Sequence, residues 1–230
     1  MKILCFGYNG IPECNHIYHC SHLFFSLQSL LNFRVDFLGE ILRLQFNNMT
    51  GVALDSISGK SGVFINESKT VTRMGGRHGL RVLGTCVLQL PAPVSLTDSG
   101  WTISVWLHTP LTGRTWHNLV DGNGNDFIVV TFQNGVLGNY HLSKYTLFNA
   151  DTLKAGWHHL AVVGNTNQDR TIYYIDGVVV GEHSGVSKGK VRTVGNRGDG
   201  NLSESFTLMS DLRIFSLPAM PEHVQKLAMT

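Results

Sequence analysis

The strongest constraint on the fold lies at residues 155–177, which have the pattern of a complete β-hairpin followed by the start of a third strand. The first half, WHHLAVV, is typical of a strand, and the second half, 171–176, is β-branched and aromatic. The turn residues GNTNQD separate the two halves. Asp176 and Gly177 predict a second turn, because Gly accepts a positive φ beside Asp. Three strands in so short a segment predict an antiparallel β protein.

The chain after residue 41 continues this pattern of short strands and turns. Residues 102–108, TISVWLH, alternate between two faces, and FTLMSDLRIF at 206–215 is a last strong strand. About a dozen short strands, with no helices alternating between them, predict an all-β fold, a two-sheet antiparallel jelly-roll sandwich. Near the end, Pro221 suits the first turn of a short helix.

Composition indicates a globular chain with an atypical N-terminal region. Of the 230 residues, 43% are hydrophobic and 15% are charged, which is typical of a folded domain. We expect an N-terminal extension at residues 1–41, either helical or disordered, and one jelly-roll domain at residues 42–230. The extension contains five zinc-type ligands, but their spacing matches no standard finger, so we expect no tight zinc site. These residues are Cys14, His16, His19, Cys20 and His22.

The net charge limits the kinds of partner that the protein is expected to bind, whereas the cysteine count does not decide its cellular compartment. The net charge is +2 and the basic residues are scattered, which gives no case for nucleic acid. The apolar run at residues 23–31 is too short to span a membrane, which needs about 20 apolar residues. The N-terminus has no clean signal peptide. Only Cys86 lies in the β region, so no disulfide pair forms there, and this leans towards a reducing compartment.

Eight short motifs, taken together in order and spacing, carry a family resemblance. They are LRLQFNN, DSISGKSG, MGGRHGLRV, WTISVWLH, GWHHLAVV, YYIDGVVVG, the VGN turn and SDLRIFSLPAMPEHVQKL. Over roughly Arg43 to Ala228 the chain resembles the laminin G-like, or concanavalin A-like lectin/glucanase, jelly-roll superfamily. The resemblance implies a carbohydrate- or protein-binding module, often calcium-dependent and extracellular. A minority of such relatives are glycosidases, so the fold does not decide the function.

The residues argue against catalysis. The retaining jelly-roll glycosidases carry Glu-x-Asp-x-Glu on one strand, where a period of two places all three carboxylates on one face. This chain has only six Glu, and none forms that motif. The block Trp157-His158-His159 has no identifiable Ser or Cys partner, so we expect core packing with one exposed His. The protein is therefore expected not to be an enzyme.

The ligand-binding candidates lie around the loop at residues 121–126. An aromatic ring with polar neighbours is how a shallow site stacks a sugar ring. Trp116 supplies the ring here, and its alternative is a purely structural role in the core. The candidate set is Arg114, Trp116, His117, Asn123 and Asn125.

Calcium is the one cofactor to consider. Asp121, Asn123 and Asn125 copy the first three ligand positions of an EF-hand, but the later positions do not match, which excludes that motif. The family resemblance instead implies calcium at Asp126, where a strand opens. Asp55 and Asp211 are the alternative, because loops near both chain ends meet in this fold. Asp side chains that bond their own turns would explain all three without a metal.

Three functions remain open. The first is a non-catalytic, lectin-like module for glycans or glycoproteins, with or without calcium. The second is a protein–protein interaction or structural domain without a sugar site, and the third is a glycoside hydrolase-like enzyme. The oligomeric state, the particular partner and the role of residues 1–41 are not determined by the sequence.

Overall fold

The computed structural model describes residues 39–46, 53–66, 69–111, 116–122, 126–131, 135–198, 200, 206 and 208–230. The Cys/His cluster of the N-terminal extension lies outside these residues. The absence of a zinc site and the domain boundary after residue 41 therefore stay predictions.

Strands of the described residues form two antiparallel sheets, and their facing sides enclose one hydrophobic core. Sheet A has the order β14-β13-β12-β7-β16-β1-β2, and β5 pairs with both β16 and β4. Its strands are β1 (Glu40–Gln45), β2 (Leu54–Asp55), β4 (Lys69–Met74), β5 (Arg77–Val82), β7 (Trp101–Thr109), β12 (Gly156–Asn165), β13 (Arg170–Ile175), β14 (Val178–Ser184) and β16 (Leu208–Phe215).

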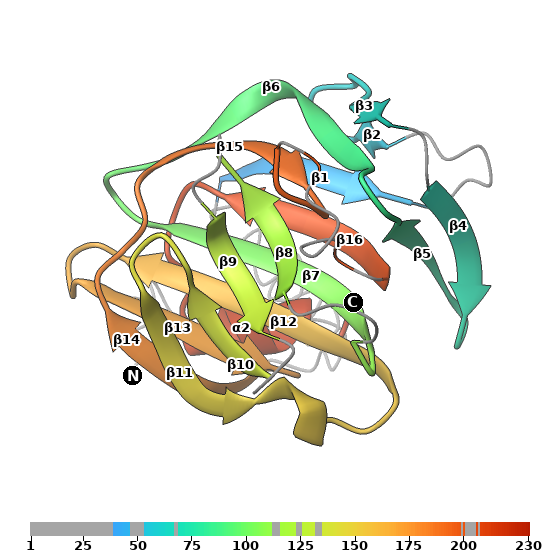
Figure 1. The fold of residues 1–230 in the computed structure, drawn as a ribbon. Helices are drawn as coiled ribbons and strands as arrows, with labels where there is room; N and C mark the ends of the chain where they lie inside the picture. The colour runs from blue at the N-terminus through green and yellow to red at the C-terminus, as the bar shows by residue number, and fades with distance from the viewer. Residues whose placement is uncertain are drawn as a thin grey trace, which may run out of the picture. The chain divides into compact units, whose positions relative to one another are not determined.

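Sheet B has the order β11-β10-β9-β8-β15-β6-β3. Its strands are β3 (Val63–Ile65), β6 (Val87–Leu96), β8 (Trp116–Asp121), β9 (Asp126–Thr131), β10 (Val136–Asn139), β11 (Lys144–Asn149) and β15 (Gly189–Val194). A short 3-10 helix, η2 (Ala150–Thr152), follows β11. In Figure 1 the sheets form two layers, with β8 and β9 in front of β7 and β12. The predicted two-sheet jelly-roll sandwich is confirmed.

The predicted hairpin lies inside sheet A and is confirmed in detail. β12 pairs with β13 on one side and with β7 on the other, and β14 follows after a tight turn. In that turn Asp176 and Gly177 both have positive φ, 50° and 79°, as a type I′ turn requires. The carboxylate of Asp176 also accepts the backbone N–H of His159 at 2.8 Å, which ties the turn to the strand before it.

Alternation along β12 shows why the sandwich has one main core. Leu160 and Val162 belong to the core between the sheets, and burying each such side chain contributes about 1.5–3 kcal/mol. Trp101 on β7 is fully buried in the same core and donates its Nε1–H to the Ser187 carbonyl at 2.8 Å. Its ring lies so close to Gly164 that a Cβ there would come within 2.5 Å of it. Only glycine fits at that position.

A second, smaller core lies on the outer face of sheet A. Helix α2 (Pro221–Leu227) begins with the proline that the sequence analysis placed in its first turn. Val224 and Leu227 of the helix pack with Ala161 and Val163, the β12 residues that point away from the main core. The helix therefore covers only the part of the outer face around Ala161 and Val163.

Candidate functional site

The outer face of sheet B carries three aromatic side chains, Trp116, Tyr140 and Tyr145. Strand pairing aligns Asn118 with Val129, Val129 with Gly138, and Gly138 with Tyr145. Residues paired directly across antiparallel strands share a face, and so do residues two apart on one strand. Trp116 therefore lies on the same outer face as Tyr145.

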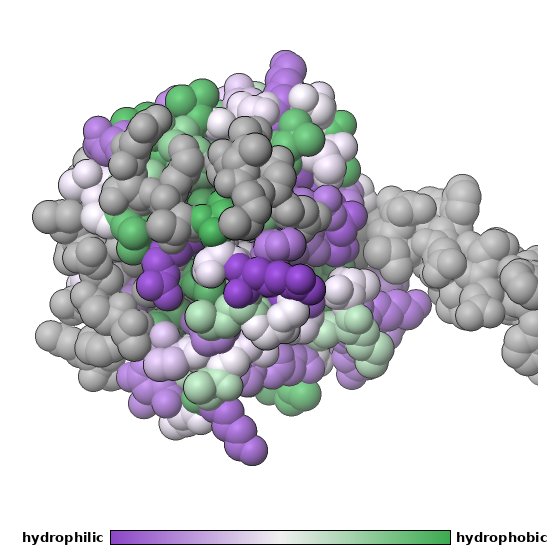
Figure 2. All heavy atoms as spheres, turned by 90° about the vertical axis from the view of Figure 1, so that its right-hand side faces the viewer, coloured by the Kyte–Doolittle hydropathy of each residue, from purple (hydrophilic) through white to green (hydrophobic). Residues whose placement is uncertain are grey.

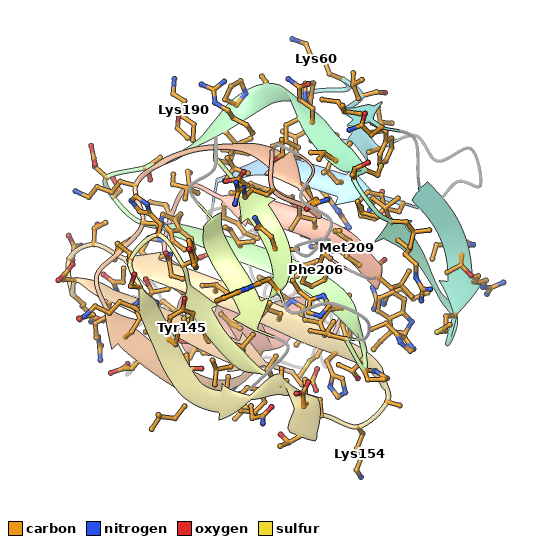
Figure 3. The ribbon with its side chains drawn as sticks, in the orientation of Figure 1. Lys60, Tyr145, Lys154, Lys190, Phe206 and Met209 are labelled. Atoms are coloured by element: carbon orange, nitrogen blue, oxygen red, sulfur yellow. The ribbon has the colours of Figure 1, made fainter. Side chains whose placement is uncertain are left out.

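These three residues lie on one outer face, and the name aromatic surface is used below for Trp116, Tyr140 and Tyr145. The rings of Trp116 and Tyr140 meet edge to face, with centroids 5.5 Å apart and an interplanar angle of 81°. Tyr145, labelled on β11 in Figure 3, lies over Gly138, where a Cβ would come within 2.1 Å of its ring. Tyr140 is 50% exposed and Tyr145 36% exposed, so ring surface remains open to a ligand.

The structure separates the two central sequence candidates. Trp116 is half-buried on the outer face, whereas His117, one residue later, is fully buried. The His117 ring points into the sandwich and meets Phe206 with centroids 6.4 Å apart. Its side chain is thus a core group, because successive residues of a strand face opposite sides. Arg114, Asn123 and Asn125 lie outside the described residues, so their role stays a prediction.

Of the calcium candidates, Asp126 opens β9 as the sequence analysis expected, opposite Asp121 in the strand register. The alternative candidates have other partners. Asp55 accepts hydrogen bonds from the backbone N–H groups of Arg43, Ile57 and Ser58, and from the Ser58 hydroxyl. Burial alone would raise the Asp55 pKa, but these hydrogen bonds hold it below its ordinary value.

Asp211 is bound by two guanidinium groups. Arg43 Nε donates to Oδ1 at 3.1 Å, and Arg213 donates to Oδ2 from Nε at 3.0 Å and also from Nη2. Two cations in these positions repel a calcium ion, so Asp55 and Asp211 do not fit a shared site. Within the described ranges, no three His, Cys, Asp or Glu side chains group closely enough to hold a metal ion. Calcium at Asp126 stays a prediction.

The outer face of sheet A contains a polar pocket of about 530 Å³ that no sequence motif indicated. Three strands, β1, β5 and β16, supply its arginines. Its lining is Arg43, Gln45, Gly75, Gly76, Arg77, His78, Ser210, Asp211, Arg213 and Thr230. Figure 2 views the molecule from the side of the β4–β5 hairpin, where strongly hydrophilic side chains gather near the middle. We call this feature the arginine pocket.

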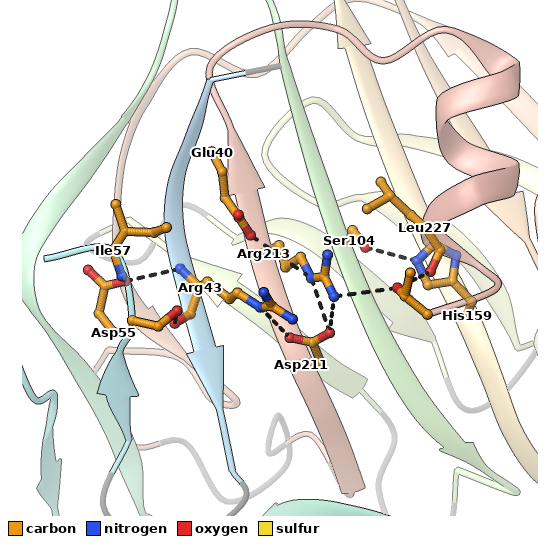
Figure 4. A network of polar contacts seen from close by, with 11 residues as sticks. Glu40, Arg43, Asp55, Ile57, Ser104, His159, Asp211, Arg213 and Leu227 are labelled. Carbon is orange, nitrogen blue, oxygen red and sulfur yellow. Dashed lines mark hydrogen bonds and ion pairs between the residues drawn. The ribbon is translucent and has the colours of Figure 1, made fainter. Parts of the chain in front are cut away.

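A β-bulge in β16 positions Asp211, the acidic side chain of the arginine pocket. The pairing of β16 with β7 shifts between Ser210 and Arg213, and Asp211 within this bulge has a positive φ of 46°. This backbone conformation is uncommon for a residue with a Cβ, and bulges of this kind often redirect a side chain. The redirected carboxylate joins Arg43 and Arg213 in the network of Figure 4. Burial alone would raise the pKa of Asp211, but the guanidinium groups of Arg213 and Arg43 lower it by more, so the pKa lies below its ordinary value and the carboxylate is ionised at pH 7.

Beside the pocket, an aromatic and imidazole cluster continues across β7 and β12. The Arg77 guanidinium lies 3.9 Å above the ring centroid of Trp106, and Trp106 meets His159 edge to face at 5.4 Å. His159 is fully buried, with its Nε2 atom 2.8 Å from the Ser104 hydroxyl. Burial lowers its pKa to about 4, Asp176 opposes this, and Arg213 and Arg77 add to it. His159 is therefore neutral at pH 7.

Comparison with known proteins adds the family. The model of the concanavalin A-like lectin/glucanases superfamily, in its laminin G form, matches residues 84–225, more than half of the chain. The chain belongs to this superfamily. A search of curated protein sequences gives no match. No helix in the described ranges is both long and apolar enough to cross a membrane.

Solved structures show the same fold at low sequence identity. The binding domain of Paraclostridial mosquitocidal protein 1 has a TM-score of 0.56 and 15% identity, covering 83% of this chain and 52% of that chain. The botulinum neurotoxin serotype D binding domain has a TM-score of 0.57 and 17% identity, covering 84% and 52%. This chain thus spans about half the length of these two domains.

A third similar structure is a domain of matching size. Domain 4 of AbnA, a GH43 extracellular arabinanase from Geobacillus stearothermophilus, was solved in complex with arabinotriose. It has a TM-score of 0.52 and 16% identity, covering 83% of this chain and 98% of that chain. Identities this low establish the shared jelly-roll fold and leave the ligand of this chain open.

Proposed function

We propose that the protein is a non-catalytic, lectin-like module that binds glycans or glycoproteins through the aromatic surface of sheet B. The observation that carries this proposal is the exposure of aromatic rings on one outer face. Sugar rings present C–H groups that stack against aromatic faces, while their hydroxyl groups stay in water or bond to polar neighbours. The resolved fold of an arabinanase domain with bound arabinotriose supports this function for the same architecture.

Rigid placement strengthens the case for a binding surface. Trp116 and Tyr145 stand on β-strands of one sheet, so the backbone ladder fixes their spacing. Their ring contacts with Tyr140 and Gly138 restrict their motion further. A ligand that meets rings already held in place loses less conformational entropy on binding.

The arrangement of the described glutamates supports a non-catalytic role. Glycoside hydrolysis needs two carboxyl groups on either side of one bond. The described glutamates lie on three separate elements, Glu40 on β1, Glu182 on β14 and Glu222 on α2. Glu182 forms a surface ion pair with Arg170 at 3.2 Å. None of the described glutamates lies on the same element as another, so no two of them are placed as a catalytic pair along one strand.

One observation favours a protein partner as the second candidate function. Leu147, on the same strand as Tyr145, is 100% exposed. Val178 and Val179 of β14 are also largely exposed. Exposed apolar side chains are typical of protein-binding surfaces when they are contiguous. Leu147 is the residue whose substitution separates this function from glycan binding.

A glycan array, run with and without calcium on the full chain, tests the proposal. We compare the unmodified protein with Tyr145→Ala and with the matched neighbour variant Leu147→Ala. Removing a stacking ring should weaken binding of the best glycan by about tenfold, equivalent to about 1.4 kcal/mol. Leu147→Ala should change it by less than about twofold, because a glycan stacks on rings.

Two outcomes would decide against glycan binding. If no glycan binds in either condition, the module has no sugar site. If Leu147→Ala weakens binding as much as Tyr145→Ala does, the apolar surface itself is recognised, which favours the protein partner. Melting curves of both variants confirm that each one folds.

A further inference from the structure

We propose that the arginine pocket of sheet A is a second binding site, one that takes the carboxylate or sulfate group of an acidic saccharide. This inference goes beyond the proposed function, because the arginine pocket and the aromatic surface belong to different sheets and share no residue.

The first argument is the charge balance of the lining. Arg43, Arg77 and Arg213 line the pocket, and Asp211 is the one carboxylate side chain in that lining. Glu40 comes within 3.9 Å of Arg213 Nε but is not part of the lining. Even when Glu40 is counted, three guanidinium side chains face two carboxylate side chains. Guanidinium groups match the planar geometry of carboxylate and sulfate oxygens and bind them with two parallel hydrogen bonds.

Arg77 is the cation that remains for a ligand. Arg43 and Arg213 both donate to Asp211, whereas no carboxylate of the described residues lies within ion-pair distance of Arg77. Its guanidinium instead stacks 3.9 Å above Trp106. Stacking uses the flat face of the group and leaves the N–H donors around its edge available, in a fixed orientation.

Backbone geometry opens the pocket beside Arg77. Gly75 and Gly76 form the turn between β4 and β5, with φ of 56° and 83°. A Cβ at Gly76 would meet no atom within 4 Å, whereas one at Gly75 would come within 3.2 Å of the Trp157 ring, so the open side of this turn lies at Gly76. A ligand can therefore approach the backbone closely at this point.

Size and polar lining favour a saccharide over a bare ion. A volume of about 530 Å³ lies within the range of small-molecule sites, about 300–1,000 Å³. Ser210, Gln45 and His78 add polar side chains to the lining, which suit the hydroxyl groups of a sugar. The ion pairs of Asp211 hold Arg43 and Arg213 in place before a ligand arrives, which lowers the entropy cost of binding.

The test is calorimetric titration of the full chain at constant ionic strength with sodium glucuronate, with glucose as its neutral counterpart and with sodium sulfate as the free oxyanion. Three variants accompany the unmodified protein: Arg77→Gln, Arg77→Lys and Arg81→Gln. Arg81 is the matched control, because it is an exposed arginine of the same strand outside the pocket lining. Tyr145→Ala serves as the control for the aromatic surface.

We expect glucuronate to bind about tenfold more tightly than glucose, and Arg77→Gln to remove about tenfold of that affinity. Arg77→Lys should recover only part of it, because lysine keeps the charge and loses the planar fork. Arg81→Gln and Tyr145→Ala should leave the affinity within about twofold, since neither residue touches the pocket. Equal melting temperatures show that the Arg77 variants are folded.

Three results would overturn the proposal. Absence of binding for both glucuronate and sulfate would remove the site. An equal loss in Arg77→Gln and Arg81→Gln would show general surface attraction. Sulfate binding as tight as glucuronate, with the same dependence on Arg77, would leave an oxyanion site and disprove the saccharide part. A loss of array binding in Tyr145→Ala leaves these outcomes unaffected, so the two proposals fail separately.

Discussion

The two outer faces of this sandwich differ in chemistry although the strands beneath them follow the same alternating pattern. On sheet A, the outward-facing positions of β1 and β16 hold Arg43, Asp211 and Arg213, which bind one another in a partly buried network. On sheet B, the outer positions hold the aromatic surface, in which Trp116 contacts Tyr140 and Tyr145 lies over Gly138. One face is tied together by charge and the other by apolar contact.

This difference indicates which side chains contribute to the stability of the fold and which are available for ligand binding. Charged groups that are buried must be paired, and loss of one partner leaves the other with an uncompensated cost. Exposed rings carry no such cost, so their removal should change ligand binding far more than stability. We therefore expect substitutions in the Arg43–Asp211–Arg213 network of sheet A to affect unfolding, and substitutions in the aromatic surface of sheet B to affect recognition.

The largest expected effect comes from Arg213→Met. The variant keeps the aliphatic stem and removes the main partner of Asp211, so the free energy of unfolding should fall by about 3–5 kcal/mol. The matched control is Arg170→Met, whose partner Glu182 is exposed, and whose loss should cost less than about 1 kcal/mol. Urea unfolding measures both. Equal losses would mean that the network is no more buried than a surface pair.

The next effect is the pH dependence carried by His159. Its folded-state pKa of about 4 lies below the ordinary 6.5, so the unfolded chain binds the proton more tightly. Stability is full above pH 6.5 and falls as the pH drops from 6.5 to about 4, by up to about 3 kcal/mol. His108 and His183 also have lowered pKa values, caused first by burial, and they act in the same direction.

A variant isolates the share of His159. His159→Gln places an amide near the Ser104 hydroxyl and cannot titrate. Its stability should therefore decline less between pH 6.5 and about 4 than that of the unmodified protein, as followed by urea unfolding at several pH values. Parallel declines in the two proteins would show that His159 does not titrate in this window.

Calcium would add a third kind of interaction, at the rim of sheet B. If Asp126 binds calcium with a dissociation constant on the order of 10⁻⁴–10⁻³ M, a concentration of roughly ten times that value stabilises the fold by about 1.5 kcal/mol. Melting curves with millimolar calcium should shift upward for the unmodified protein and stay constant for Asp126→Ala. A shift in neither protein excludes a site, and an equal shift in both places the site elsewhere.

The smallest expected effect on stability is that of Tyr145→Ala. Because the ring is partly exposed and lies over a glycine, its removal should lower the free energy of unfolding by less than about 1 kcal/mol. Urea unfolding beside Arg213→Met gives the direct contrast between the faces. If Tyr145→Ala lowers the free energy of unfolding as much as Arg213→Met does, the aromatic surface contributes to stability as strongly as the charged network.

Local signals made the fold predictable. The hairpin around Asp176 and Gly177, the strand alternation and the proline of α2 each depend on neighbouring residues, and all three appear in the structure. His117 shows a signal that was present but not used. It follows Trp116 directly on a strand, and the period of two already places the two side chains on opposite faces. His159 is the buried histidine of the block Trp157-His158-His159, and Trp106 and Ser104 contact its ring.

The arginine pocket could not be read from the sequence. Arg43 and Asp211 are 168 residues apart, and only the pairing of β1 with β16 brings them together. The bulge that turns Asp211 outward depends on sheet geometry. The residue with positive φ in this bulge is an aspartate and not a glycine, so the sequence contains no signal for it. Long-range register, which sequence patterns do not specify, decides this site.

The residues that follow helix α2 connect it to the arginine pocket, because Thr230 belongs to the pocket lining. Thr230 follows the helix, and its hydroxyl lies 3.4 Å from Arg213 Nη2, while Val224 and Leu227 alone anchor the helix among its buried residues. Few buried side chains hold this helix, which is typical of segments that open locally before the rest of a fold. A ligand that contacts Thr230 should therefore stabilise the docked helix, and amide hydrogen exchange throughout α2 should slow when the ligand is bound.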